Sequence, residues 1–366
     1  MSRFASSPSG DDSLPPLPET WVERLRRILP AERFEPCLAS FAAEKPVALR
    51  VNTLRATIAS ARAELEGLGL APRGVPGLDE ALLVDRSARP QIVAAAAVAE
   101  GRLYVQGLSS MLAARLLDPQ PGEEVLDLAA APGGKTLHIA ALMRNEGRIA
   151  AVEPIRGRYY KLQANLRRGG ATIVRTYRAD GRSVGRRAPE RFDRVLLDAP
   201  CSGEARFHRR RPSSWATWSP RKIRECARKQ RGLLRSALAA LKPGGTLLYC
   251  TCAFAPEENE LVVDDCVCRA GEGIEIAPIE LGVAAAVQPG WTRWEDHPMH
   301  PDLALAVRIL PDERFDGFFF CKLVKRAGRR SRSALRARPA RSGRRRPARR
   351  RRRRPRGESL GEPLEP

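Results

Sequence analysis

Short apolar runs alternate with helix-length amphipathic stretches along the second half of the chain. The apolar runs after residue 122 read EVLDLAA, RIAAVEP, ATIVRTYRA, RVLLDAP and GTLLYCTC. Amphipathic stretches such as KTLHIAALMR and GRYYKLQANLRR follow the first runs within a few residues. This alternation predicts an α/β fold, in which helices cover both faces of a parallel sheet. Ligands on such sheets bind at the carboxyl ends of the strands, so we expect the chemistry there.

The pattern before residue 100 predicts a small α+β unit. TWVERLRRILP and ASARAELEGLGL have helical periodicity, whereas VALRVNTL and ALLVD are typical of strands. At the other end, LALAVRILPDERFDGFFFCKLVK predicts two antiparallel strands that finish the sheet. We therefore divide the chain into a disordered start (1–17), a small α+β domain (18–100) with a linker to about residue 120, a Rossmann-like domain (121–325) and a disordered tail (326–366).

The net charge of +22 is unevenly spread. From Arg326 to the end there are 17 Arg, no Lys and 3 Glu, a net charge of +14, which leaves +8 for residues 1–325. The tail has almost no large apolar residue to bury, so we expect it to be disordered and available to phosphate backbones. The alternative is a solvated extension with no specific role. In either case its charge indicates contact with a polyanion rather than chemistry.

Composition excludes several classes of protein. The chain has 366 residues, 43% of them hydrophobic, which is enough for two domains and a real core. It has no run of about eighteen apolar residues, and the start MSRFASSPSG lacks an apolar stretch, so we expect a cytoplasmic protein with no membrane contact. The eight cysteines form no C-x-x-C pair, which indicates reduced thiols. We expect no metal site, and a monomer.

The segment VLDLAAAPGGKT (125–136) follows the first predicted strand and opens a helix. Its small residues, above all Gly133 and Gly134, allow a ligand to approach the backbone, and the amino end of a helix favours anionic groups. A phosphate loop would need a glycine six residues before Lys135, where Ala129 stands, so the sequence excludes an NTPase.

Three acidic residues follow three successive predicted strands: Asp127, Glu153 and Asp180. Glu153 has the position from which nucleotide-binding sheets bind ribose hydroxyls, and Asp180 could accept a hydrogen bond from an adenine amino group. Each acid alone is more often a helix cap or a turn residue. Together they indicate a cofactor with an adenosine moiety and no triphosphate, which S-adenosylmethionine fits.

Two cysteines stand where adjacent predicted elements end, Cys201 in DAPCSG and Cys252 in LLYCTCAFAPEENE. Either alone could be a small buried hydrophobe. We expect a helix to begin after each, and a helix amino end lowers the pKa of a nearby thiol and makes it nucleophilic. Cys250 lies inside the apolar run and is expected in the core, and Cys266 and Cys268 are expected to pack from an amphipathic helix.

The motifs RVN, YVQGLSS, DLAAAPGGKT, DAPCSG, KPGG, YCTCAFAPEENE and DGFF occur in this order. In order and spacing they resemble the RsmB and Sun type RNA cytosine-5 methyltransferases, the NSUN family, over about residues 18–325. A DNA cytosine methyltransferase would share only the first Pro-Cys. An amine methyltransferase would have Asn or Asp with Pro-Pro and an aromatic residue there. The resemblance implies a Rossmann-like class I methyltransferase sheet preceded by a small α+β RNA-binding domain.

The resemblance also implies roles for single residues. Cys252 matches the family's attacking cysteine, Asp198 the acid that binds the target base, and Cys201 the residue that assists product release. Lys135 matches a lysine that points into the site. Cofactor contacts are implied for Ala130, Ala131, Pro132, Gly133, Gly134, Lys135, Glu153, Arg158, Asp180 and Asp198.

The resemblance leaves the substrate and the activity open to alternatives. Ribosomal RNA is favoured over transfer RNA by the resemblance alone. A non-catalytic RNA-binding or ribosome-assembly protein on the same fold is the rival hypothesis, and the intact Cys201, Cys252 and Asp198 favour the enzyme. The chain departs from the family with Glu153 in place of the usual Asp, and with GEARF after DAPCS, where a second glycine is frequent.

Overall fold

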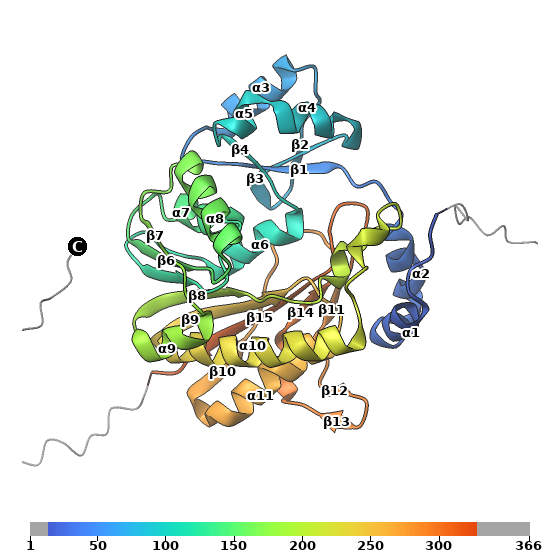
Figure 1. The fold of residues 1–366 in the computed structure, drawn as a ribbon, viewed down its shortest axis with the longest axis vertical. Coiled ribbons are helices and arrows are strands. Elements are labelled where there is room, and N and C mark those ends of the chain that lie inside the picture. Colours follow the sequence, from blue (N-terminus) through green and yellow to red (C-terminus); the bar gives the residue numbers. More distant parts are fainter. Residues whose placement is uncertain (1–13, 328–366) are drawn as a thin grey trace, which may run out of the picture. The chain divides into compact units, whose positions relative to one another are not determined.

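The computed structural model describes residues 14–327 of the chain (Figure 1). The expected disordered start and the expected arginine-rich tail therefore lie largely outside the described residues. The helices are α1 (Glu19–Ile28), α2 (Ala31–Ser40), α3 (Ile58–Gly67), α4 (Arg89–Ala94), α5 (Ala96–Ala99), α6 (Leu108–Leu117), α7 (Gly134–Leu142), α8 (Arg156–Gly169), α9 (Val184–Arg187), α10 (Pro220–Ala240) and α11 (Glu260–Ala270).

A nine-stranded sheet forms the centre of the molecule, in the order β11-β14-β15-β9-β8-β5-β6-β7, with β10 paired to β15. Its strands are β5 (Glu124–Asp127), β6 (Arg148–Val152), β7 (Val174–Tyr177), β8 (Phe192–Asp198), β9 (Leu241–Thr251), β10 (Ile274–Ala277), β11 (Val287–Pro289), β14 (Val307–Ile309) and β15 (Phe318–Lys325). Strands β5 to β9 run parallel, and β15 and β14 add to them in antiparallel fashion. A separate two-stranded ribbon pairs β12 (Arg293–Trp294) with β13 (His297–Pro298).

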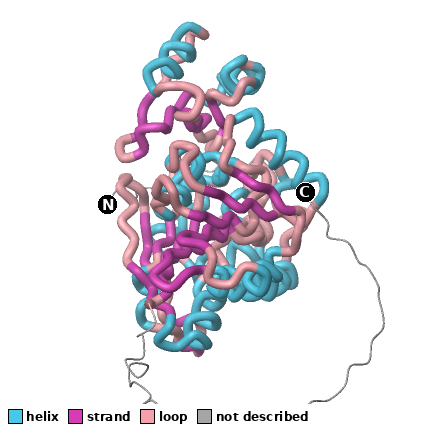
Figure 2. The backbone as a smooth tube through the Cα atoms, turned by 90° about the vertical axis from the view of Figure 1, so that its left-hand side faces the viewer, coloured by secondary structure: helices cyan, strands magenta, loops and turns pink. Residues whose placement is uncertain are grey.

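Helices cover both faces of this sheet. Figure 1 shows α6, α7 and α8 on one side of it and α9, α10 and α11 on the other, and the turned view in Figure 2 shows the strands between helical layers. The α/β class, the parallel strands and the antiparallel finish predicted from the alternation are therefore confirmed.

A four-stranded antiparallel sheet with α3, α4 and α5 forms the N-terminal domain. Its order is β2 (Arg73–Val75), β3 (Leu78–Val84), β1 (Val47–Val51) and β4 (Leu103–Val105). Helices α1 and α2 pack elsewhere: Trp21 of α1 contacts the rings of Phe41, Phe207 and Phe254, and so it joins the core of the large sheet. The domain boundaries expected from the sequence remain a prediction.

The RVN motif ties the small sheet to the large one. Arg50 and Asn52 are fully buried. Arg50 Nη2 donates to the carbonyl oxygen of Gly134 at the start of α7 (3.2 Å), and Asn52 Nδ2 donates to the carbonyl oxygen of Gly169 at the end of α8 (2.8 Å). This motif therefore connects the small sheet to helices α7 and α8 on the large sheet.

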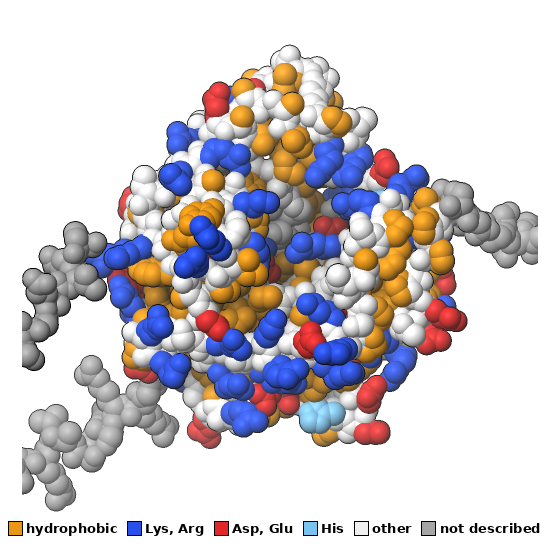
Figure 3. Space-filling view, in the orientation of Figure 1, with side chains coloured by type: hydrophobic (Ala, Val, Ile, Leu, Met, Phe, Trp, Pro, Cys, Tyr) orange, Lys and Arg blue, Asp and Glu red, His pale blue; other side chains and the backbone are white. Residues whose placement is uncertain are grey.

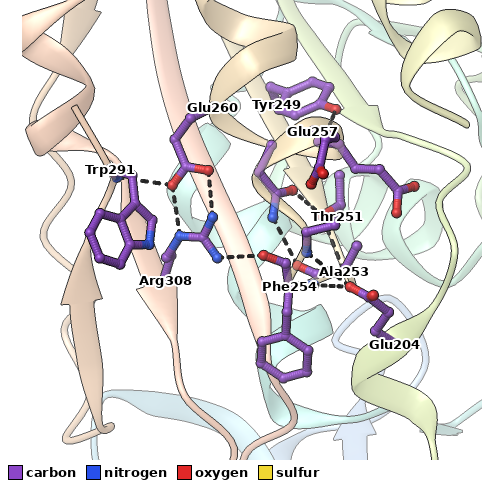
Figure 4. A network of polar contacts seen from close by, with 12 residues as sticks. Glu204, Tyr249, Thr251, Ala253, Phe254, Glu257, Glu260, Trp291 and Arg308 are labelled. Carbon is purple, nitrogen blue, oxygen red and sulfur yellow. Dashed lines mark hydrogen bonds and ion pairs between the residues drawn. The ribbon is translucent and has the colours of Figure 1, made fainter. Parts of the chain in front are cut away.

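A buried polar network fixes the segment that follows β9 (Figure 4). Arg308 of β14 donates to Glu260 Oε1 of α11 at 2.7 Å and to the carbonyl oxygen of Phe254 at 2.8 Å. Both charged side chains are at most 3% exposed. Because an unpaired buried charge is strongly unfavourable, this pair holds the β9–α11 connection against the sheet.

Candidate active site

The carboxyl ends of two neighbouring parallel strands bring the predicted reactive residues together. β8 ends at Asp198 and β9 ends at Thr251, and the register of the two strands places Asp198 opposite Cys250. The loops beyond these ends place Cys201 Sγ 3.4 Å from Cys252 Sγ. Both thiols and the carboxylate predicted from DAPC and TC thus lie at one edge of the sheet.

Lys135 enters the same site from the start of α7. Its Nζ lies 2.7 Å from Asp198 Oδ2 and donates to Ser110 Oγ of α6, also at 2.7 Å. The ring of Phe318, from the DGFF motif, lies 5.5 Å from the same ammonium group. Burial lowers the pKa of Lys135, but the Asp198 carboxylate together with the Cys250 and Cys252 sulfurs outweighs burial and raises that pKa, so the ammonium form is kept.

The two thiols have different electrostatic surroundings. The hydrogen bond from Cys201 lowers the pKa of Cys252 against the effect of burial, and the Arg206 guanidinium, with Nε 3.4 Å from Cys252 Sγ, lowers it further. The same bond between the thiols, together with burial, raises the pKa of Cys201 well above its usual value. Cys252 is therefore the thiolate of the pair and Cys201 its hydrogen-bond donor.

The expectation that a helix begins after each cysteine is only partly met. A short 3-10 turn follows each thiol, η3 (Glu204–Arg206) after Cys201 and η5 (Pro256–Glu258) after Cys252, and the α-helix begins only at Glu260. Turns of three residues lack the aligned peptide dipoles of a helix. The lowered pKa of Cys252 comes instead from side chains, first from the Cys201 hydrogen bond and then from Arg206.

Two buried glutamates fasten the loops that carry the thiols. Glu258 accepts from Ser202 through the backbone N–H (2.9 Å) and the hydroxyl, and from Gln230 Nε2 of α10 at 3.1 Å. Glu204 Oε2 accepts from the backbone N–H of Phe254 at 2.7 Å, as Figure 4 shows. Burial, followed by repulsion from Glu204, raises the pKa of Glu258 to about 8. Each loop is thus held by a carboxyl group of the other.

The expected cofactor residues form a second cluster at the ends of β5 and β6. Glu153 is buried, with Oε2 3.3 Å from Arg158 Nη1, and Arg158 Nη2 donates to the carbonyl oxygen of Ala131 at 2.8 Å. Gly133 has φ +106°, and a Cβ there would lie 3.0 Å from a side-chain atom of Leu162. The loop Ala130–Gly134 is therefore fixed close to Glu153.

The other two predicted strand-end acids, Asp127 and Asp180, differ in burial and in their partners. Asp127 is buried; its Oδ2 accepts from Thr136 Oγ1 at 2.7 Å, while its Oδ1 has no hydrogen-bond partner in the described part of the chain. Burial raises the pKa of Asp127 to about 6. Asp180 is less buried, and its half-exposed carboxylate pairs with Arg182 (2.6 Å).

The remaining predicted cysteines divide between core and surface. Cys250 is fully buried, and burial raises its pKa well above the usual value, which fits the expected core position. Cys266 is also buried. The expectation that Cys268 packs is wrong, because it is exposed on α11, on the face turned away from the sheet.

Sequence reasoning missed Ser110 and Arg206, which contact Lys135 and Cys252, and also Glu258, which holds the loop that carries Cys201. Ser110 lies in the quoted motif YVQGLSS, and Glu258 lies in APEENE, where the glutamates indicated only a helix start. Arg206 lies in GEARF, the stretch that departs from the family pattern. That departure was the sequence feature that could have drawn attention to this residue.

The surface around the site is hollowed and basic. Figure 3 shows a hollow between the N-terminal domain and the large sheet, with Lys and Arg side chains around it. Within residues 14–327 there is no group of three or more His, Cys, Asp or Glu side chains that could hold a metal ion. No helix in that same range is long and apolar enough to cross a membrane.

Comparison with protein families gives two matches. A family model described as 16S rRNA methyltransferase RsmB/F matches residues 114–324, and one described as a Methyltr_RsmF/B-like, ferredoxin-like domain matches residues 17–90. Ribosomal RNA small subunit methyltransferase F of Cronobacter sakazakii is 38% identical over 271 residues, which cover 72% of this chain and 56% of that protein. The chain thus spans about half the length of the curated relatives that it matches.

Two solved structures from Pyrococcus horikoshii have a similar fold. A methyltransferase homolog protein is 31% identical, with a TM-score of 0.70 over 84% of this chain and 100% of that chain. NSun6, solved with SFG, has a TM-score of 0.71 at 24% identity, over 84% of this chain and 98% of that chain. At the lower identity the likeness shows the fold alone.

Proposed function

Because the chain belongs to the RsmB/F family of 16S rRNA methyltransferases, we propose that it transfers a methyl group from S-adenosylmethionine to carbon 5 of a cytosine in ribosomal RNA, through a covalent cysteine adduct. The expected class I methyltransferase sheet and the preceding α+β domain are confirmed. The observation that carries the proposal is the pair of thiols: Cys252 Sγ lies 3.4 Å from Cys201 Sγ, and the pKa of Cys252 is lowered.

Cys252 is the nucleophile in this proposal. Carbon 5 of cytosine is a poor nucleophile, and addition of a thiolate to carbon 6 converts the ring into an enamine that attacks the methyl group. The thiolate form is required, and Cys252 is the thiol whose pKa is lowered. Arg206 and the Cys201 thiol stabilise its negative charge before the attack.

Asp198 and Lys135 position the base. The Asp198 side chain is 30% exposed at the strand end and so can reach the ring nitrogen and the amino group of a cytosine that enters the site. The carboxyl group accepts from the amino group of the base and, when it carries a proton, donates to the ring nitrogen, which stabilises the charge that develops on the ring during thiolate addition. The 2.7 Å contact with Lys135 fixes the Asp198 carboxyl group on the side of the thiols. The target base has to leave its stack to reach this position.

Cys201 acts in the second half of the cycle. After methyl transfer, the proton on carbon 5 leaves, the electron pair re-forms the ring double bond, and the bond from carbon 6 to Cys252 sulfur breaks. The first cause of the raised pKa of Cys201 is its hydrogen bond to Cys252. That cause is removed while Cys252 is bonded to carbon, so Cys201 can lose its own proton to solvent. As a thiolate it then accepts the proton that leaves carbon 5.

The residues at the ends of β5, β6 and β7 fit S-adenosylmethionine. The Asp127 Oδ1 atom is buried without a hydrogen-bond partner among residues 14–327, and the buried Glu153 carboxylate is connected to the loop Ala130–Gly134 through Arg158. The closely packed Gly133 keeps the backbone of this loop free of a side chain. Glu153 would hold the ribose, Asp180 the adenine amino group, and Ala130–Gly134 the rest of the molecule. When bound, S-adenosylmethionine supplies the methyl group.

Replacing Asp180 tests the cofactor site. Its carboxylate keeps free lone pairs beside Arg182 with which to accept from an adenine amino group. We expect Asp180→Ala to weaken S-adenosylmethionine binding by about 1 to 3 kcal/mol, measured by isothermal titration calorimetry. An unchanged affinity would remove Asp180 from the site.

The order of the two cysteines gives the test of the mechanism. Cys252→Ala should abolish turnover and form no covalent complex with RNA, because the adduct cannot start. Cys201→Ala should allow attack and methyl transfer but stall release, so that the protein stays on RNA as a band that resists denaturation in a gel. The double variant should trap nothing. A trapped band from Cys252→Ala and none from Cys201→Ala would assign the nucleophile to the other cysteine.

Two alternatives remain beside this proposal. Transfer RNA is the second candidate substrate, and bisulfite sequencing of total RNA with and without the gene distinguishes the two RNAs. A non-catalytic RNA-binding or ribosome-assembly role would leave every cytosine unchanged in that experiment. Location in the cytoplasm, the monomeric state, the domain boundaries and an RNA-binding role of the N-terminal domain stay part of the proposal.

A further inference from the structure

One face of the large sheet is open beside α9. On β6, Ala151 packs under Leu162 and Leu166 of α8. Ala150 and Val152 point to the opposite face by the two-residue repeat of a strand, and there they line a cavity of about 610 Å³. Helix α9 has only 4 residues, whereas α10, with 21, covers the neighbouring β8 and β9. Within residues 14–327, the short helix leaves this cavity against β6 and β7 on this side.

The rim of this cavity is rich in arginine. It is lined by Arg148, Arg175, Arg187 and Arg191, with Glu124 as the one acidic lining residue. Glu124 pairs with Arg191 at 3.0 Å and with Arg148 at 3.5 Å. Within residues 14–327, Arg175 and Arg187 form no ion pair with a carboxylate. The rim therefore has two uncompensated positive charges, and it attracts an anionic partner. Figure 3 shows hydrophobic side chains on the left of the molecule, with Lys and Arg side chains beside them.

An exposed aromatic ring lies beside these charges. Tyr177 at the end of β7 is 40% exposed, and the guanidinium of Arg175 lies 5.6 Å from its ring centre. The other lining residues are mostly apolar, from small ones such as Ala150 and Ala179 to the larger Phe192. An apolar cavity with an aromatic ring and arginines at its rim has the composition on which unstacked bases and their phosphates bind.

We propose that this cavity binds a single-stranded segment of RNA, with a base against Tyr177 and phosphates on Arg175 and Arg187. The positive charge of the rim suits either RNA or an acidic protein segment. The exposed ring and the adjacent guanidinium favour RNA, because they offer a surface on which a base can stack and which an acidic helix does not use. The proposal takes RNA as the substrate, as above, and adds a contact site outside the reactive centre.

The cavity is placed to act together with the active site. It extends to Val152 and Ala179, the residues directly before Glu153 and Asp180. An RNA held at both places binds the second site intramolecularly, which raises the overall affinity without any new contact at the thiols. Arg175, Tyr177 and Arg187 are not among the residues expected to contact the cofactor, so we expect side-chain changes there to alter RNA affinity and not cofactor affinity.

The test uses the full chain and a fluorescein-labelled single-stranded RNA of mixed sequence, about 12 nucleotides long. We expect Tyr177→Ala to raise the Kd measured by fluorescence anisotropy at least about fivefold. The double variant Arg175→Gln/Arg187→Gln should flatten the slope of log K against log salt by about 1.4, because two phosphate contacts are lost. RNA substituted with 4-thiouridine should crosslink under ultraviolet light to the peptide that contains Tyr177.

A second arginine and tyrosine pair gives the matched control. On α8, Arg156 lies 5.8 Å from the ring of Tyr160, which is 53% exposed and is not among the cavity residues. Arg156→Gln and Tyr160→Ala should leave Kd and salt slope unchanged. Cavity variants that bind like these controls, with folding and cofactor affinity intact, would overturn the proposal and leave the proposed function standing. An unmodified protein that fails to bind RNA would overturn both.

Discussion

Arg206 supplies positive charge to Cys252 from η3, and the other charged groups near this thiol, Lys135 and Asp198, already pair with each other. We expect Arg206→Gln to raise the pKa of Cys252 by about one unit or more, because the thiolate loses an opposite charge at contact distance. Less thiolate is then present at neutral pH, so alkylation slows there and recovers as the pH rises. The measurement is the rate of iodoacetamide alkylation at Cys252, followed by peptide mass spectrometry from about pH 5 to pH 9.

Two further variants separate charge from packing at this position. Arg206→Lys keeps the charge and should keep most of the effect. Arg211→Gln, an exposed arginine in the same loop, should leave the alkylation profile of Cys252 unchanged. An unshifted profile in Arg206→Gln would show that the Cys201 hydrogen bond alone activates Cys252. This assay needs no RNA, so it is independent of the proposed reaction.

At the residue scale, the place of the reactive groups could be predicted and their electrostatics could not. Asp198, Cys201 and Cys252 follow apolar runs, and parallel strands bring such positions to one edge. Which thiol loses its proton depends on a contact between Arg206 and a residue 46 positions away. No local periodicity contains that information.

At the scale of elements, Glu258 links η5 to the loop after β8. Burial and Glu204 raise its pKa from 4.5 to about 8, so the folded protein binds this proton more tightly than the unfolded chain. Its contribution to stability is full below about pH 4.5 and is lost as the pH rises through about 8. We expect the wild type to lose up to about 1.4 kcal/mol per pH unit in this window relative to Glu258→Gln, in urea unfolding at its two ends. Parallel pH dependences would contradict this.

The pattern predicted the regular elements of the large sheet better than its connections. Runs with period two or 3.6 gave the parallel strands and helices α7 and α8. Helix α2 contains Pro36 and was not predicted from the pattern, and the turns η3 and η5 replaced the expected helix starts. Such short elements depend on contacts such as that of Glu204 with the backbone of Phe254, which lie far apart in the sequence.

At the scale of the whole molecule, the order of the elements predicted the fold but not the place of α1. The first hundred residues suggested one α+β unit, yet Trp21 packs on Phe207 and Phe254 of the catalytic part, while the core of the small sheet begins at Val47. The amphipathic pattern of α1 shows that one of its faces is buried. It carries no information on which sheet buries it.

The charge of the whole chain lies mainly in residues 326–366, which have 17 Arg against 3 Glu. We expect removal of this segment to weaken RNA binding and to flatten its salt dependence by up to about 0.7 for each phosphate no longer neutralised, while cofactor affinity stays the same. The measurement is RNA affinity across a series of salt concentrations.

A variant that keeps the length of the segment but has its arginines replaced by glutamine should behave like the truncated protein, because charge and not length releases counterions. The same salt slope in the truncated and full-length proteins would show that the segment neutralises no phosphate of the RNA.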